Sequence, residues 1–181
     1  MKKSVRWITE TAVMLAVLIT LQYLTKPLGQ LVTGTCVNAV LAVAVLLGGM
    51  GCGVTVAVIS PMAAFLLGIA PQILTVPAIM AGNGVYVLVL RTLSGGKISW
   101  SLRTIAAWIT AAAAKFAVLY AVVVWVICGL LAQSLLAAGT LKEPMLKALP
   151  ATFSWPQLGT ALAGGALALL VVPALRKGLR K

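Results

Sequence analysis

A single lysine inside a long apolar stretch stands out for its chemistry. Lys115 lies within the apolar run 102–132. A lysine at the centre of a bilayer costs about 2.5–3.5 kcal/mol on insertion scales, so its presence there indicates function. The acidic residues Glu10 and Glu143 offer no obvious partner for it. We therefore expect Lys115 to pair with an anionic ligand. Snorkelling of the side chain to the inner surface, or a neutral amine bonded to carbonyl groups, are the alternatives.

Uncharged polar and aromatic side chains in the outer halves of the apolar runs form a second group. Asn83 and Tyr86 are three residues apart and share a helix face. Such groups can line a mostly apolar ligand pocket, although they also serve as contacts between membrane helices. Thr33 and Thr35 occupy the same region. The candidate ligand-binding residues are Lys115, Asn83, Tyr86, Asn38, Gln72, Tyr120, Trp125, Gln30, Trp155 and Gln157.

The residue inventory excludes most catalytic and metal chemistry. The sequence contains no histidine and two acidic residues, so Ser–His proteases, H-E-x-x-H zinc sites and paired-carboxylate catalysis have no residues to use. There is no nucleotide-binding P-loop motif. The three cysteines, Cys36, Cys52 and Cys128, are far apart and read as packing residues. We expect a protein that is not an enzyme and has neither a metal nor a cofactor.

The composition requires a bilayer as solvent. Hydrophobic residues make up 62% of the chain and charged residues 9%, against roughly 25% charged residues in soluble domains. The net charge of +12 could indicate nucleic-acid binding. However, the basic residues lie between and beyond the apolar runs, as loop charges do in membrane proteins. We therefore expect a membrane protein with no nucleic-acid partner.

Six apolar runs are long enough to cross the membrane, which takes about 20 residues for a core of about 30 Å. We predict one all-α domain over residues 1–181, a six-transmembrane-helix bundle. A glycine-rich turn, 48–53, separates the second and third helices. The connection 133–156 is the longest, and its prolines and aromatic residues fit either a lid over an outward-facing site or an inert connector. The predicted helices are 7–24, 31–47, 54–70, 73–90, 102–132 and 157–175.

The basic residues set the predicted topology. Cytoplasmic loops carry an excess of Lys and Arg, and six spans with both termini in the cytoplasm satisfy this rule. Five spans would leave the basic carboxyl-terminal tail outside. The cations then expected inside are Lys2, Lys3, Arg6, Arg91, Lys97, Arg103, Arg176, Lys177, Arg180 and Lys181. Those expected outside are Lys26, Lys142 and Lys147.

Small residues line one face of the first predicted helix. Ala12 and Ala16 form an A-x-x-x-A pattern, and Thr20 extends it by one turn. Small residues four apart allow close helix–helix contact. In so alanine-rich a chain, chance or packing within the chain also explains the pattern.

With this pattern, the chain resembles the substrate-binding (S) components of energy-coupling factor (ECF) transporters. The similarity lies in the six spans, the short length, the internal termini and the A-x-x-x-A helix. The segments 32–47, 48–53, 58–61 and 77–83 are also similar to that family. The resemblance covers essentially the whole chain and rests on layout and residue texture.

The resemblance implies a function and partners. Ala12, Ala16 and Thr20 would dock on a transmembrane coupling subunit driven by two cytoplasmic ATPases, in the bacterial cytoplasmic membrane. The ligand would be a vitamin or other micronutrient taken from outside. The absence of histidine disfavours the nickel and cobalt branch, and the absence of membrane-embedded acids disfavours cationic thiamin. We expect a carboxylate-bearing vitamin or precursor, with pantothenate first and lipoate, niacin and biotin comparable.

Two other functions stay open at the level of sequence. A stand-alone channel or secondary transporter would usually show inverted repeats or broken helices in corresponding halves, and no convincing internal repeat is visible. A membrane assembly or scaffold protein would bind no small molecule at all.

Overall fold

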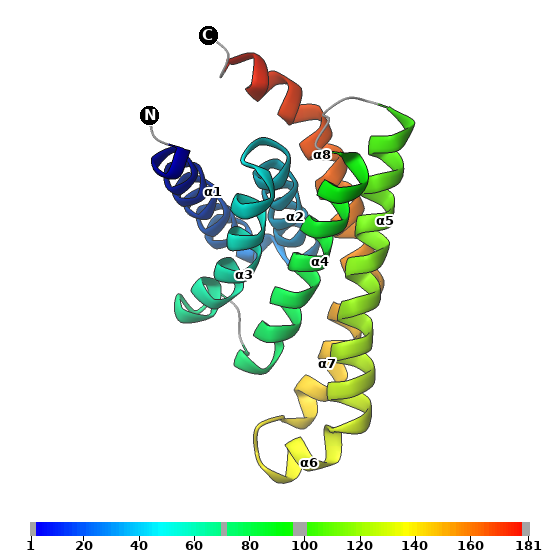
Figure 1. The fold of residues 1–181 in the computed structure, drawn as a ribbon. Helices are drawn as coiled ribbons and strands as arrows, with labels where there is room; N and C mark the ends of the chain where they lie inside the picture. Colours follow the sequence, from blue (N-terminus) through cyan, green and yellow to red (C-terminus); the bar gives the residue numbers. More distant parts are fainter. Residues whose placement is uncertain (1–2, 70–71, 96–100, 179–181) are drawn as a thin grey trace.

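The fold is a helical bundle with the two chain ends at the same end of the molecule (Figure 1). The structure is a computed structural model, and it describes residues 3–69, 72–95 and 101–178. Within these residues every regular element is helical. The principal helices are α1 (Lys3–Thr25), α2 (Gln30–Leu47), α3 (Gly49–Leu66), α4 (Val76–Ser94), α5 (Leu102–Leu119), α6 (Ala132–Ala137), α7 (Glu143–Phe153) and α8 (Trp155–Gly178).

Six helical segments among the described residues are long and apolar enough to cross a membrane, which confirms the predicted fold class at that level. They are Ser4–Leu28, Gln30–Leu47, Gly49–Leu66, Ile73–Ser94, Leu102–Leu130 and Trp155–Gly178. Short 3₁₀ turns, η1 (Lys26–Leu28) and η2 (Ile73–Thr75), precede α2 and α4. The predicted cations Lys2, Lys97, Arg180 and Lys181, and the predicted end of the third helix at residue 70, lie outside the described residues.

The turn predicted over residues 48–53 is wrong in extent. α2 ends at Leu47 and α3 begins at Gly49, which takes a positive φ of 83°. The glycines that follow are part of α3 and permit close packing. A Cβ on Gly53 would lie 2.6 Å from Val45 Cβ, so glycine lets α3 approach α2 directly.

The fifth span changes its helical geometry part-way. α5 continues without a break into a π-helical stretch, η3 (Tyr120–Leu130). Its i→i−5 bonding is illustrated by the Leu131 amide, which donates to Val126 oxygen at 2.9 Å. The combined apolar segment of 29 residues is longer than one crossing requires. Figure 1 shows it running the full length of the bundle.

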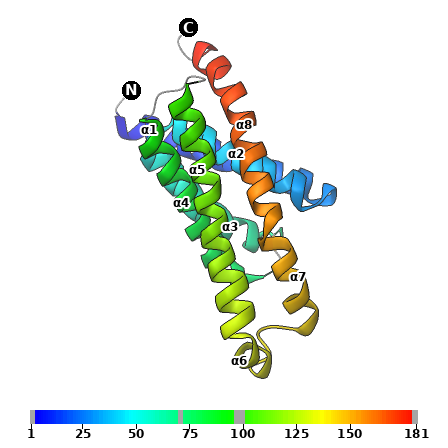
Figure 2. The ribbon, with the colours of Figure 1, turned by 90° about the vertical axis from the view of Figure 1, so that its right-hand side faces the viewer.

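The connection predicted over residues 133–156 is largely helical. It contains α6 and α7, and Pro144 occupies the first turn of α7, where proline's missing N–H has no helical partner to lose. Figure 2 shows α7 beside the η3 stretch and below α8, at the end of the molecule opposite the termini.

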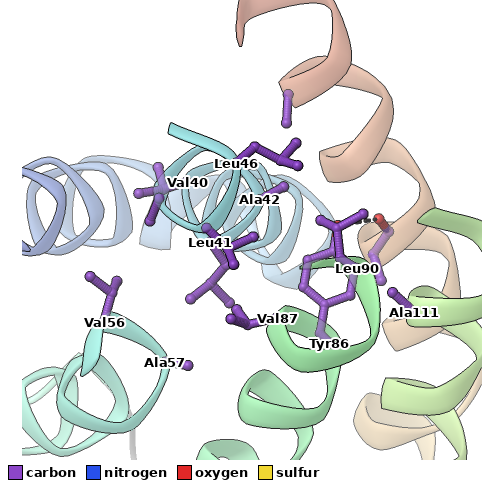
Figure 3. Packing of buried hydrophobic residues seen from close by; sticks show 14 of the residues in the cluster. Val40, Leu41, Ala42, Leu46, Val56, Ala57, Tyr86, Val87, Leu90 and Ala111 are labelled. Atoms are coloured by element: carbon purple, nitrogen blue, oxygen red, sulfur yellow. Dashed lines mark hydrogen bonds between the residues drawn. The ribbon is translucent and has the colours of Figure 1, made fainter. Parts of the chain in front are cut away.

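The main core lies where α2, α3, α4, α5 and α8 meet. Figure 3 shows Leu41 of α2, Ala57 of α3, Val87 of α4 and Ala111 of α5 converging there. α8 packs closely on α2 because Gly164 faces it: a Cβ on Gly164 would lie 2.6 Å from the backbone oxygen of Thr35. This close packing fixes α8 against α2, which carries Asn38.

Candidate ligand-binding cavity

A cavity of about 290 Å³ lies in the half of the bundle away from the termini. Its walls come from α1, α2, the connection before α4, α4 itself, α5, α7 and the start of α8. The polar residues that line it are Gln22, Gln30, Thr33, Asn38, Gln72, Thr75, Asn83, Lys115, Thr152 and Gln157. The apolar lining includes Val37, Ile69, Ile79, Leu119, Leu149 and Phe153.

Lys115 lies on the cavity wall and is held by two asparagines from different helices. Its Nζ donates to Asn38 Oδ1 of α2 at 2.6 Å and to Asn83 Oδ1 of α4 at 2.7 Å. The side chain is 3% exposed, so it does not snorkel to a membrane surface. The Tyr86 ring centroid is 5.8 Å from Nζ, within cation–π range. Short bonds from two rigid helices therefore fix the position of the amine.

Asn38 is itself held in place by α2 and α8. Its Nδ2 donates to Gly34 oxygen at 2.8 Å and to Thr160 Oγ1 at 3.3 Å. Thr160 in turn donates to Gln157 oxygen at 3.1 Å. Because the nitrogen of the amide is bonded in this way, its oxygen is directed at Lys115. These hydrogen bonds determine which side of the Asn38 amide carries the oxygen and which the nitrogen.

No carboxylate neutralises Lys115 within the described residues. Of the two acids in the sequence, Glu10 pairs with Arg6 at 2.7 Å on α1. Glu143 is exposed at the start of α7. An ammonium group carries three donors, and the two asparagine oxygens take two of them. When the amine is protonated, its third donor and its positive charge are available to a molecule in the cavity.

α7 forms one wall of the cavity. Leu149 and Phe153 are buried between it and the η3 stretch, and Ala148 and Thr152 also line the cavity. Gln157 Nε2 donates to Thr152 oxygen at 3.1 Å, which ties α7 to the start of α8. The segment predicted as a lid or a connector thus contributes residues to the cavity itself.

The helix ends near Gln22 and Gln30 are joined by side-chain bonds to backbone oxygens. Lys26 Nζ donates to Gly68 oxygen at 2.7 Å, which joins the end of α1 to the end of α3. Thr33 Oγ1 donates to Thr25 oxygen at 2.9 Å. These bonds hold the ends of α1 and α3 and the start of α2 together.

Two cavity residues carry polar atoms without a partner. Gln22 Oε1 and Gln72 Oε1 are buried and accept no hydrogen bond in the described structure. Gln22 lies near the end of α1, and Gln72 lies just before η2. Both side chains line the same cavity as Lys115. Buried polar atoms are nearly always hydrogen-bonded, so these two require an explanation.

The structure brings together most of the sequence-predicted binding residues. Lys115, Asn83, Asn38, Gln72, Gln30 and Gln157 all line the cavity, as does Thr33. Tyr86 is fully buried beneath Lys115 and donates to Ala161 oxygen at 3.4 Å. It therefore supports the site from behind rather than lining it.

Three predicted aromatic residues lie elsewhere. Tyr120, Trp125 and Trp155 do not line the cavity; Trp125 is 72% and Trp155 73% exposed. Trp155 stacks on Phe116, with ring centroids 5.5 Å apart. These exposed rings are outside the cavity lining. Exposed Trp and Tyr residues are common at the membrane–water interfaces of membrane proteins. Thr35 also lies outside the cavity lining, with its hydroxyl bonded to Leu31 oxygen.

The sequence reasoning missed Gln22, Thr75 and Thr152 as cavity residues. Gln22 was detectable, because it is a polar residue near the end of the first predicted span and close in sequence to Gln30. Thr75 and Thr152 had no distinguishing signal, since short hydroxyl side chains are common where membrane helices begin and end.

The arrangement suits recognition of a small molecule. No group of three Cys, Asp or Glu side chains that could hold a metal ion occurs within residues 3–69, 72–95 and 101–178. Comparisons of the chain with protein-family profiles, curated proteins and solved structures find no match. The function is therefore inferred from the residues of the cavity.

Proposed function

We propose that this protein is the membrane-embedded binding subunit of an uptake system for a small, water-soluble, carboxylate-bearing vitamin or precursor. A separate transmembrane coupling subunit and two ATPases would energise release of the ligand, as in ECF transporters. Pantothenate is the first candidate ligand. The proposal rests chiefly on Lys115, a buried lysine on a cavity wall with no carboxylate partner among the described residues.

The energetic argument concerns the charge of Lys115. Two amide oxygens offset part of the cost of burying an ammonium group, but they carry no formal charge. A ligand carboxylate that accepts the third N–H would form a charge-assisted hydrogen bond, which contributes about 1.5–3 kcal/mol. This bond would offset part of the desolvation free energy of burying Lys115 once the ligand binds. A structural lysine would need no adjoining cavity.

The cavity also favours a small polar ligand. Its volume of about 290 Å³ is at the lower end of the roughly 300–1,000 Å³ typical of small-molecule sites. Amide and hydroxyl groups alternate with apolar walls, which is suited to a molecule with several hydrogen-bonding groups. Lys115 is the one charged residue among the described residues that line the cavity, so a single negative charge matches it.

The distribution of cations supports an outward-facing cavity. Arg6, Arg91, Arg103 and Arg176 lie at the ends of their helices toward the termini, and the cavity lies in the other half of the bundle. Since cations concentrate on the cytoplasmic side, the termini belong inside. The cavity would then receive its ligand from outside the cell.

The exposed face of α1 supports docking on a partner. Ala12, Ala16 and Thr20 are all exposed along α1. Only 11% of the most apolar 18-residue stretch within Ser4–Leu28 is buried inside the bundle, compared with 56% of Gln30–Leu47. A peripheral helix with a flat strip of small residues is suited to close contact with another membrane helix.

The test is thermal stability of the detergent-purified protein against a panel of vitamins and precursors with and without a carboxylate. A ligand at about 100 times its Kd adds roughly 2.7 kcal/mol of stability. We expect a carboxylate ligand to raise the melting temperature of the wild type and of Lys147→Met, an exposed control on α7. Lys115→Met should abolish the rise. Equal stabilisation of Lys115→Met, or no carboxylate ligand at all, would contradict the proposal.

A further inference from the structure

Two glutamine oxygens without partners on the wall of one cavity are hard to explain as packing alone. Gln22 belongs to α1 and Gln72 to the segment before η2, and both line the cavity of Lys115. Their Oε1 atoms are the buried side-chain atoms without a hydrogen-bond partner among the described residues. A buried acceptor without a hydrogen bond lowers the stability of the fold by about 1–3 kcal/mol. Two of them at one cavity indicate acceptors held ready for donors that the protein does not supply.

The glutamines lie nearer the ends of their helical segments than Lys115 and its asparagine partners do. Asn83, which binds Lys115, is about 10 Å along α4 from its first residue Val76, by the 1.5 Å rise per residue. Gln72 comes before Val76, and Gln22 lies within one turn of the end of α1. A molecule with its anion on Lys115 thus extends toward these two side chains.

From this arrangement we infer that the ligand is a monocarboxylate with N–H or O–H donors at the end away from its carboxylate, and that Gln22 and Gln72 accept these donors. The inference deepens the proposed function and rests on it. Rotation about the terminal torsion of glutamine is soft, so each amide can turn its oxygen to a donor in the cavity. Among the other amides on the wall, Asn38, Asn83 and Gln157 each have a hydrogen bond within the protein, and Gln30 is exposed.

This recognition discriminates among carboxylates of similar size. Pantothenate has an amide N–H and hydroxyl groups beyond its carboxylate, and biotin has ureido N–H groups; both fit. Lipoate and nicotinate carry no N–H or O–H donor outside the carboxyl group, so they would leave both glutamine oxygens unpaired. Missing donors lower affinity because the site's buried acceptors then stay unsatisfied.

The first arm of the experiment needs no ligand. Gln22→Met and Gln72→Met replace an unpaired amide with an apolar chain of similar length. Each variant should therefore raise the melting temperature of the purified protein, by about 2–4 °C. Gln133→Met is the matched control, because Gln133 is exposed at the start of α6, and it should leave the melting temperature unchanged. A lower melting temperature for the two cavity variants would show that their amides hold the fold together, and would overturn the inference.

The second arm measures Kd for pantothenate, biotin, lipoate and nicotinate. We expect pantothenate or biotin to bind, and each cavity variant to weaken that binding by about 10-fold, the effect of one buried donor left without an acceptor. If lipoate or nicotinate binds in a Lys115-dependent way and the glutamine variants bind it normally, the inference is wrong and the proposed function stands. If no carboxylate shows Lys115-dependent binding, the proposed function fails and the inference fails with it.

Discussion

The replacement Asn83→Asp tests the role of Lys115 by giving it an internal counterion. Asn83 Oδ1 accepts from Lys115 Nζ at 2.7 Å, and aspartate keeps that oxygen while adding a full negative charge. At an effective dielectric constant of about 20, charges at this separation attract by about 6 kcal/mol before desolvation. Because the lysine is already buried, a partner charge should raise the melting temperature of the ligand-free protein.

The same replacement should abolish recognition of an anion. A ligand carboxylate bonded to Lys115 would lie about 5 Å from the new carboxylate, where repulsion is about 3 kcal/mol at the same dielectric constant. This corresponds to a loss of roughly 100–200-fold in affinity. The measurement is isothermal titration of the purified variant with the carboxylate ligand found for the wild type.

The control for Asn83→Asp is Gln133→Glu, which adds the same charge at an exposed position of α6. It should leave affinity unchanged apart from a small effect that salt screens. Asn38→Asp should behave like Asn83→Asp, since Asn38 Oδ1 lies 2.6 Å from Nζ. Wild-type affinity in both aspartate variants would refute the view that the free charge of Lys115 binds the ligand.

Two further predictions concern packing. Ala12→Leu and Ala16→Leu should leave ligand affinity unchanged but abolish uptake into cells that contain the coupling subunit, because larger side chains prevent close docking of α1. The control Ala113→Leu, at another exposed alanine, should keep uptake. Loss of ligand binding in the α1 variants would contradict this prediction. Gly164→Ala should lower the melting temperature by several degrees, since its Cβ would meet the α2 backbone at 2.6 Å. Gly159→Ala, with no atom within 4 Å of its Cβ, should not lower it, and equal effects would argue against close α2–α8 packing.

The sequence predicted the cavity's charged residue and much of its polar lining for a clear physical reason. A lysine and asparagines inside apolar runs are costly in a bilayer, so their positions carry information without any structure. The distance from Lys115 to Asn38 and Asn83 could not be predicted, because it depends on how α2, α4 and α5 pack. The snorkelling alternative is wrong, because the Lys115 side chain is 3% exposed. Its bonds to two amide oxygens are also what the neutral-amine alternative predicts.

The aromatic residues show where the sequence signal ends. In a run as apolar as residues 102–132, hydrophobic periodicity does not separate the inner face from the lipid face. Trp125 was therefore assigned to the cavity although it is exposed. The π-helical stretch from Tyr120 also changes the angle between successive residues, so side chains beyond it face directions that an α-helical pattern does not give.

The sequence gives the segment 133–156 as the longest connection between predicted spans, with prolines and aromatic residues that fit a lid or an inert connector. Pro144 is compatible with the first turn of α7, and Pro150 lies within that helix. Proline therefore marks a helix start here as well as a break. The contribution of Thr152 and Phe153 to the cavity follows from this helix and could not be assigned while the segment was treated as irregular.

The most direct test of the central claim is a double-mutant cycle between Lys115 and the carboxylate of the ligand. Kd is measured for the carboxylate and for its uncharged primary amide, each with the wild type and with Lys115→Gln, which keeps a side-chain donor. If Lys115 binds the carboxylate, the two changes will be coupled by about 2–3 kcal/mol, so that the amide loses little when the lysine is removed. Additive losses would show that Lys115 and the carboxylate do not interact, and would contradict the account.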